Sequence, residues 1–317
     1  MPEPTISNLP TVEGRARGGA KADGWTLARI LPVRESCVPD SANPDSSTTT
    51  SLILWSLWLL AGVALAIGGA LVLFPSHTDR YFAWPIRAPI AASALGACYL
   101  GLGVLAVSLS RPLQWSSVRL VMPIIGLGAT IMLVATTLHR ASFAWGSPAA
   151  WVWLFLYLLA PPGFVRISLR MTRSHTETPR MHSPLPAGLR GLLIGVAATF
   201  GVIGATLFLQ PMLLIPHWPW PLTPLVARAY SAFILAYALW AGLVARISSE
   251  DAATIPLSAF ALFPLLAFAA PWLHAGTFRA ASPAGIVYLI ITGGTSLAFA
   301  WGMRVVRRRD TSAVLTG

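Results

Sequence analysis

A segment of this chain recurs without a gap 135 positions further along. Residues 138–149 read LHRASFAWGSPA and residues 273–284 read LHAGTFRAASPA, with Leu, His, Phe, Ser, Pro and Ala in the same six places. A fixed long period is the sign of a duplicated structural unit, which sets the architecture and doubles every candidate site. The sequence therefore predicts two copies of one unit.

The composition indicates that both units lie in a membrane. Of the 317 residues, 55% are hydrophobic and 10% are charged, and the mean hydropathy is +0.67; in soluble domains about a quarter of the residues are charged. The uniformly apolar runs favour helices over the alternating strands of a membrane barrel. Runs long enough to cross about 30 Å of hydrocarbon occur at 52–74, 90–109, 120–138, 149–169, 191–213, 225–245, 255–273 and 284–303.

We therefore expect an all-α integral membrane fold of eight transmembrane helices. Four helices per unit return the chain to the side on which it started, so the units form two parallel four-helix repeats about an axis near the membrane normal. The expected parts are a disordered cytoplasmic tail at 1–50, repeat 1 at 51–169, a cytoplasmic linker at 170–190, repeat 2 at 191–303 and a basic cytoplasmic tail at 304–317.

The arginines predict the orientation. If the N-terminus is cytoplasmic, seventeen of the 22 Lys and Arg residues lie inside, and both termini are cytoplasmic by the positive-inside rule. The net charge of +11 is then a topology signal and an attraction to anionic lipids at the cytoplasmic face. We expect a bacterial inner membrane protein and no nucleic-acid partner. The five basic residues outside are Arg80, Arg87, Arg140, Arg228 and Arg279.

Residue types that carry catalysis are scarce in the predicted spans. They contain no Asp or Glu, and Asp79 is the acidic residue expected outside. A proton relay or cation site built on intramembrane carboxylates is therefore not expected. Sequence patterns for zinc proteases, serine hydrolases and phosphate loops are absent. We accordingly expect no catalytic residue, no metal site and no cofactor.

The remaining candidate is a set of aromatic and histidine residues at the outer interface. His and Phe keep the same four-residue spacing in both copies, and a Trp-Pro motif precedes each pair. Polar and aromatic groups that converge in an apolar cleft are typical of ligand sites. We therefore predict an outer vestibule between the repeats, lined by Trp84, His139, Phe143, Trp220, His274 and Phe278.

Structural roles remain open for these residues and for the motifs around them. Interfacial Trp commonly forms an aromatic belt. Ser147-Pro148 and Ser282-Pro283 fit helix starts with Ser as the N-cap and Pro at the first helical position. Pro161-Pro162-Gly163 fits the end of the fourth helix. The two histidines also fit a bis-histidine haem, provided that both rings converge.

The motifs carry a resemblance over about residues 75–303. The pattern F/W-x-W-P-I/L-x-x-P, a Gly/Ala-rich helix, and L-H-x-x-x-F-x-x-x-S-P follow one another in each half. In these features the chain resembles a group of uncharacterised multi-pass bacterial membrane proteins. The resemblance implies the eight-helix membrane fold and carries no function to transfer.

Three classes of function stay open at this point. The leading hypothesis is a non-catalytic membrane protein that recognises a small ligand or a membrane partner at its extracytoplasmic face. The alternative is a permease for a neutral, lipophilic or anionic small molecule, with the fourth helix as its mobile part. A membrane enzyme or a haem or quinone carrier is the third.

Overall fold

Every regular element of the described residues is helical. The computed structural model describes residues 44–111, 113, 115–174, 185–247 and 250–316. Most of the tail expected at 1–50 lies outside these residues, as does the 175–184 part of the linker. The long helices are α1 (Pro44–Leu73), α3 (Pro89–Ser110), α4 (Trp115–Leu138), α5 (Pro148–Ser174), α6 (Ala187–Leu209), α8 (Pro224–Ile247), α9 (Glu250–Leu273) and α10 (Pro283–Thr316).

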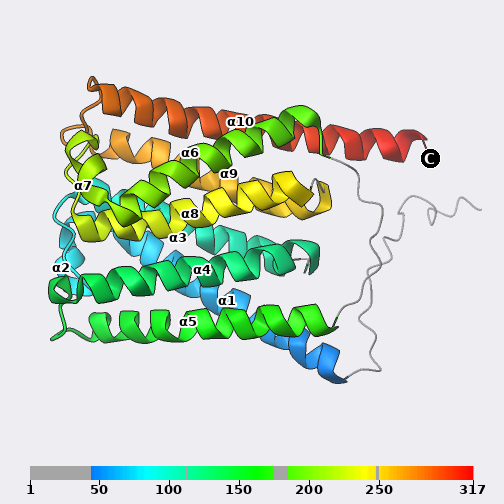
Figure 1. The fold of residues 1–317 in the computed structure, drawn as a ribbon, viewed down its shortest axis with the longest axis horizontal. Helices are drawn as coiled ribbons and strands as arrows, with labels where there is room; N and C mark the ends of the chain where they lie inside the picture. Colours follow the sequence, from blue (N-terminus) through cyan, green and yellow to red (C-terminus); the bar gives the residue numbers. More distant parts are fainter. Residues whose placement is uncertain (1–43, 112, 114, 175–184, 248–249, 317) are drawn as a thin grey trace, which may run out of the picture. The chain divides into compact units, whose positions relative to one another are not determined.

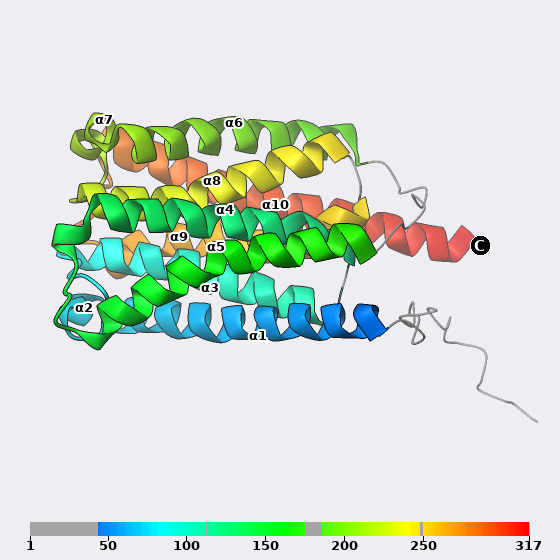
Figure 2. The same ribbon diagram turned by 60° about the horizontal axis from the view of Figure 1, so that its bottom comes forward.

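Short helices occupy three of the connections. They are η1 (Pro75–His77) and α2 (Thr78–Tyr81) after α1, η2 (Arg140–Ser142) after α4, and α7 (Pro211–Leu214) and η3 (Ile215–His217) after α6. We call the end of the helices that carries loops 74–88, 139–147, 210–223 and 274–282 the four-loop end. The labels α2 and α7 lie at this end and the C-terminus of α10 lies at the other (Figures 1 and 2).

Proline is the first residue of four of these helices, and serine caps two of them, as the sequence predicts. A Pro at the first helical position has the required φ and has no N–H to leave unpaired. Ser147 Oγ accepts a hydrogen bond from Ala149 N at 3.1 Å, and Ser282 Oγ accepts one from Gly285 N at 3.0 Å. Both Ser-Pro pairs are therefore confirmed as helix starts. The four prolines are Pro89, Pro148, Pro224 and Pro283.

The helix end expected at Pro161-Pro162-Gly163 is wrong, and two other helices extend beyond the apolar runs. Helix α1 begins at Pro44, inside the segment expected to be a disordered tail, and α5 continues through Pro161 and Pro162 to Ser174. The two prolines have no N–H to donate to the carbonyls of the residues four positions earlier, but a long apolar helix tolerates this loss where neighbouring groups compensate. Helix α10 likewise runs on into the segment expected to be a basic tail.

Seven of the described helices are long and apolar enough to cross a membrane, and α9 contributes a shorter apolar stretch, Ala261–Leu273. Burial separates them into two classes. The apolar window is 78% buried in α3, 56% in α8 and 50% in α4, but between 11% and 28% buried in α1, α5, α6 and α10. Outward faces that expose so many large apolar side chains fit lipid as their solvent. The chain is a multi-pass membrane protein.

Helices from different parts of the chain pack against one another. Helix α1 packs on α3 and α6 on α8, while α4 packs on α5 and α9 on α10. Between these hairpins, α3 packs against α9 and α4 packs against α8. Figures 1 and 2 show the long helices running alongside one another. The buried core therefore forms where the first and second halves of the chain meet.

Glycine permits the close approach of α1 to α3. A Cβ atom on Gly68 would lie 2.8 Å from the backbone nitrogen of Leu100 and 2.9 Å from the carbonyl oxygen of Gly96. Gly204 of α6 is 136 positions after Gly68, and a Cβ there would lie 2.8 Å from Cγ of Leu235 on α8. Small residues at helix crossings are typical of membrane proteins, because they let backbones pack closely.

Candidate ligand-binding site

The two predicted histidines each bond to a helix of the other half of the chain. His139 follows α4, and its Nε2 accepts a hydrogen bond from Nη1 of Arg228 on α8 at 2.6 Å. His274 follows α9, and its Nε2 lies 2.8 Å from Oγ of Ser93 on α3. Ser93 and Arg228 are 135 positions apart, as are the two histidines. The same long-range contact thus occurs twice.

Electrostatics favours the neutral form of both imidazoles. An arginine has only N–H donors, so His139 Nε2 must be unprotonated to accept its bond. Burial lowers the pKa of His139, and the positive charge of Arg228 lowers it further. Burial also lowers the pKa of His274. Arg228 is held from a second side, because its Nε donates to the carbonyl oxygen of Phe208 at 2.9 Å.

The predicted aromatic residues belong to two clusters, one in each half. In the first, the ring of Trp84 lies 4.6 Å from that of Phe82, 5.1 Å from Phe143 and 4.8 Å from Trp153. In the second, the ring of Trp220 lies 5.5 Å from Trp218, 6.3 Å from Phe278 and 5.0 Å from Tyr288. Members of the second cluster stand 135 or 136 positions after those of the first.

The two Trp-Pro tryptophans pack inside these clusters. Trp84 is 2% exposed and Trp220 is 1% exposed. Among the described residues, neither indole Nε1 has a hydrogen-bond acceptor. Each indole instead makes a T-shaped contact, at 90° with Trp153 and at 85° with Tyr288. These rings therefore support the four-loop end from within.

The six predicted site residues are thus brought together as two pairs of rings and two separate histidine contacts. Trp84 meets Phe143, and Trp220 meets Phe278. Of the six, Trp220 lines one of the two cavities described below. Sequence reasoning missed Arg228 and Ser93 as the partners of the histidines. An arginine inside the predicted span 225–245 was the available signal, because ionisable residues in such spans need a partner.

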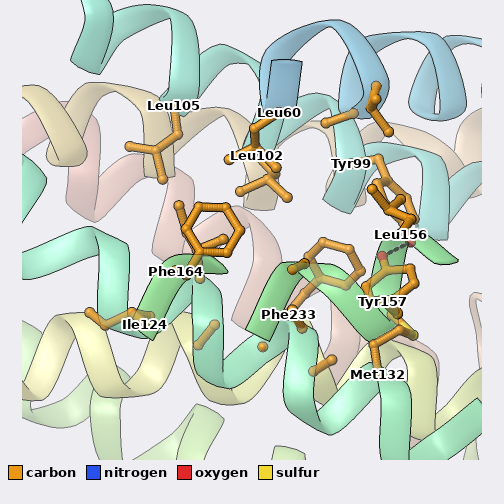
Figure 3. Close-up of a pocket in the computed structure, with 18 of the residues that line it drawn as sticks. Leu60, Tyr99, Leu102, Leu105, Ile124, Met132, Leu156, Tyr157, Phe164 and Phe233 are labelled. Carbon is orange, nitrogen blue, oxygen red and sulfur yellow. Dashed lines mark hydrogen bonds between the residues drawn. The ribbon is translucent and has the colours of Figure 1, made fainter. Parts of the chain in front are cut away.

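A cavity of about 590 Å³ lies between α1, α3, α4, α5 and α8. We call it the Tyr99 cavity. Its volume falls within the range of about 300–1,000 Å³ that is usual for small-molecule sites. Figure 3 shows Tyr99 and Tyr157 meeting at its edge, with the rings of Phe164 and Phe233 nearby. Its lining also includes Leu60, Leu102, Leu105, Ile124, Met132, Leu156 and Gly163.

The Tyr99 cavity opens on the outward surface between α1 and α5. Leu59 of α1 and Leu159 of α5 line it and are 66% and 67% exposed. Val152 and Phe155 line the same side and are also exposed. Because these outward faces fit lipid, the mouth of the cavity faces the region where a bilayer would lie.

The tyrosine pair is the main polar feature of this cavity. The hydroxyl oxygens of Tyr99 and Tyr157 lie 2.5 Å apart, and both residues are buried. Two hydroxyls carry two protons and can accept through both oxygens, and their mutual bond uses one proton. One O–H proton and several lone pairs remain for a further partner. No sequence motif predicted this pair, because the two residues are 58 positions apart and come into contact only through helix packing.

A second cavity, of about 570 Å³, lies between α6, α8, α9 and α10. We call it the Trp220 cavity. It occupies the position in the second half that the Tyr99 cavity occupies in the first, because four of its lining residues stand 135 positions after lining residues of the Tyr99 cavity. These residues are Ile234, Phe263, Val287 and Thr292, which correspond to Tyr99, Gly128, Val152 and Tyr157. It differs in chemistry: the tyrosine pair is replaced by Ile and Thr. It also extends to the four-loop end, where Arg279 and His217 line it.

The described residues include no group of three or more His, Cys, Asp or Glu side chains that could hold a metal ion. The side-chain polar groups that line the two cavities are hydroxyls, the thiol of Cys98, the indole N–H groups of Trp218 and Trp220, and the side chains of Arg279 and His217. No family model, curated protein or solved structure matches the chain.

Proposed function

We propose that this chain is a non-catalytic membrane protein that recognises a lipophilic small molecule within the bilayer. The observation that carries the proposal is the Tyr99 cavity, which is lined by apolar side chains, faces the expected lipid region and holds one hydrogen-bonded hydroxyl pair. An apolar cleft with a few polar groups that fix orientation is the usual form of a small-molecule site. The residual O–H suits a neutral ligand with one acceptor, such as a carbonyl or ether.

In this proposal the fold comprises eight transmembrane helices in two parallel four-helix repeats. The packing pattern supports it, because each contact has a counterpart at the same offset: α1–α3 with α6–α8, α4–α5 with α9–α10, and α3–α9 with α8–α4. The bonds of His139 to Arg228 and of His274 to Ser93 repeat in the same way. A two-fold axis along the membrane normal relates such pairs.

The proposed orientation places both termini in the cytoplasm of the cell and the four-loop end outside. The positive-inside rule supports it, since most of the basic residues then lie inside. The proposed ligand site differs from the outer vestibule that the sequence predicts. The aromatic rings expected to line the vestibule pack in two clusters, and the open volume lies beside these clusters, between the helices.

A permease remains a second candidate, and helix α5 favours it. Pro161 and Pro162 lie within α5, next to Gly163 and Ala160 of the cavity lining. Prolines inside a helix leave carbonyls unpaired and let the helix bend. A bend at this point would change the width of the cavity mouth between α1 and α5, as release of a bound molecule to the other leaflet requires.

Gly163 allows the proposed site to be blocked. A Cβ atom there has no neighbour within 4 Å, although the residue lines the cavity. Gly163→Phe therefore places a ring in the cavity without a clash at its Cβ. Gly195→Phe on α6 is the matched control, because that glycine is exposed and also has open space around its Cβ.

The probe is a photoreactive long-chain methyl ketone added to the full-length protein in nanodiscs. We expect cross-links at Tyr99 cavity residues of α1, α4 or α5, located by peptide mass spectrometry. Gly163→Phe should abolish them and Gly195→Phe should not. Cross-links that are spread evenly over the lipid-facing helices, or that persist in Gly163→Phe, would overturn the proposal.

A further inference from the structure

The two cavities occupy equivalent positions, but their polar groups differ in charge. The polar groups of the Tyr99 cavity are neutral, whereas Arg279 and His217 line the Trp220 cavity at the four-loop end. The position equivalent to Arg279 in the first half is Ala144. Since the backbones match, with Ala144 N donating to Ala83 and Arg279 N donating to Pro219, the difference lies in the side chains.

Arg279 is positioned at the mouth of the Trp220 cavity. Its backbone nitrogen donates to the carbonyl oxygen of Pro219 at 3.0 Å, and its Nη2 donates to the carbonyl oxygen of Trp218. Both acceptors belong to residues that line the same cavity. A guanidinium has five N–H donors, so donors beyond this one bond are present for a ligand. Arg279 is exposed, and a bound headgroup would remain hydrated in part.

The surroundings of Arg279 lack opposing charge. Among the described residues lining the Trp220 cavity there is no Asp or Glu. In the sequence of the four loops at this end, Asp79 is the acidic residue, and it belongs to the loop of the first half. The exposed His217 lines the same cavity and can donate a further hydrogen bond there. The mouth of this cavity is thus complementary to an anion.

The interior of the same cavity is apolar and deep. Phe200 on α6 and Phe263 on α9 line it, nine and ten residues before their helices end at the four-loop end. At 1.5 Å per residue the cavity therefore extends about 15 Å along the helices, roughly half the thickness of a bilayer core. A volume of about 570 Å³ accommodates one flexible chain of small-molecule size.

From these features we infer that the Trp220 cavity binds an amphiphile with one apolar chain and an anionic headgroup, with the headgroup held at Arg279. The inference rests on the proposed function and adds a second ligand class to it. The Tyr99 cavity takes a neutral lipophile, and the Trp220 cavity takes its anionic counterpart from the leaflet at the four-loop end.

The test uses the full-length Gly163→Phe variant, in which the Tyr99 cavity is blocked, in phosphatidylcholine nanodiscs, with three probes that share one chain: oleate, methyl oleate and oleyl alcohol. We expect oleate to bind about tenfold more tightly than the two neutral probes, as a charge-assisted hydrogen bond allows. Arg279→Ala should remove this preference, and Arg279→Lys should retain part of it. The control is Arg87→Ala, an exposed arginine in the first-half loop, which should bind oleate as the parent protein does.

A second variant separates binding from folding. Thr292 is the position equivalent to Tyr157 of the first half. Thr292→Tyr should therefore fill the Trp220 cavity and weaken the binding of all three probes, while the variant keeps the gel-filtration profile and the unfolding midpoint of the protein without this change. Equal binding of oleate and methyl oleate, an unchanged preference in Arg279→Ala, or unchanged binding in Thr292→Tyr would overturn the inference.

Two further results assign the source of the anion and keep the proposals apart. Competition with oleate by lysophosphatidylglycerol, which also has one acyl chain, supports the inference and identifies a single-chain phospholipid as the ligand if it depends on Arg279; lack of competition supports a free carboxylate. If the methyl ketone still labels the Tyr99 cavity while oleate shows no preference over methyl oleate, the inference about the Trp220 cavity fails and the proposed function stands. If neither cavity binds its probe, both fail.

Discussion

Removing one hydroxyl of the tyrosine pair should destabilise the protein more than the loss of one exposed hydroxyl. The oxygens of Tyr99 and Tyr157 are 2.5 Å apart, and the residues are 2% and 8% exposed. In Tyr157→Phe, the hydroxyl of Tyr99 loses this partner while it stays buried. Leaving a buried polar group unpaired costs about 1–3 kcal/mol, so each single variant should lower the free energy of unfolding by an amount in this range.

The double variant Tyr99→Phe/Tyr157→Phe should cost less than the sum of the two single changes, because no hydroxyl is then left unpaired. Side-chain hydrogen bonds between membrane helices measured by such cycles contribute about 0.6 kcal/mol on average and up to about 1.7 kcal/mol. We expect a coupling energy within these limits. The assay is unfolding of the parent protein and three variants in mixed micelles, followed by the fluorescence of the tryptophans.

The same variants report on ligand binding. If the residual O–H proton of the pair binds the ligand, the double variant should bind the photoreactive ketone more weakly, and its binding of an apolar hydrocarbon of equal length should not change. If the destabilisations of the two single variants sum to that of the double variant to within about 0.5 kcal/mol, as expected for independent sites, the hydrogen bond between the tyrosines would be refuted. Equal loss of ketone and hydrocarbon would refute its role in recognition.

Three further outcomes follow from the structure. Because burial and the neighbouring arginine lower the pKa of His139 below its ordinary 6.5, the folded state favours the neutral imidazole; thermal stability should fall as pH drops below about 6.5, and His139→Gln should lose that part of the dependence. Gly68→Ala should destabilise the protein by about 1–3 kcal/mol in an unfolding titration, as overpacking does, because its Cβ would lie 2.8 Å from a backbone nitrogen; Gly69→Ala, whose Cβ has open space, should not. In a background without native cysteines, an impermeant thiol reagent applied to intact cells should label Asp79→Cys and not Glu177→Cys; the reverse would invert the orientation.

Local physical rules account for the parts of this protein that could be predicted from the sequence. An apolar run of about 20 residues must form a helix to satisfy its backbone in lipid, and the long helices follow the predicted runs to within a few residues at most ends. Pro148 and Pro283 start helices because proline fits the first helical position. The same reasoning failed at Pro161, where a helix end was expected, because a long apolar run in lipid still satisfies most of its backbone groups as a helix, so α5 continues past two residues that local propensity disfavours.

The candidate site was only partly predictable for a related reason. The duplicated motif identified both histidines and both tryptophans as equivalent residues, but a repeat shows which positions correspond and does not show what they touch. Trp84 and Trp220 had the expected partners in Phe143 and Phe278. Their burial, however, makes them supports of the four-loop end, and of the two only Trp220 lines a described cavity.

The sequence by itself determined the class of protein and the helical segments and predicted a correspondence between the two halves, because each of these depends on composition, run length or spacing along the chain. The tertiary structure alone decided that α3 packs on α9 and α4 on α8, that His139 meets Arg228, and that Tyr99 meets Tyr157. These contacts join residues 58 or more positions apart. They depend on which helix faces fit together in three dimensions, and that fit leaves no periodic signal in the sequence.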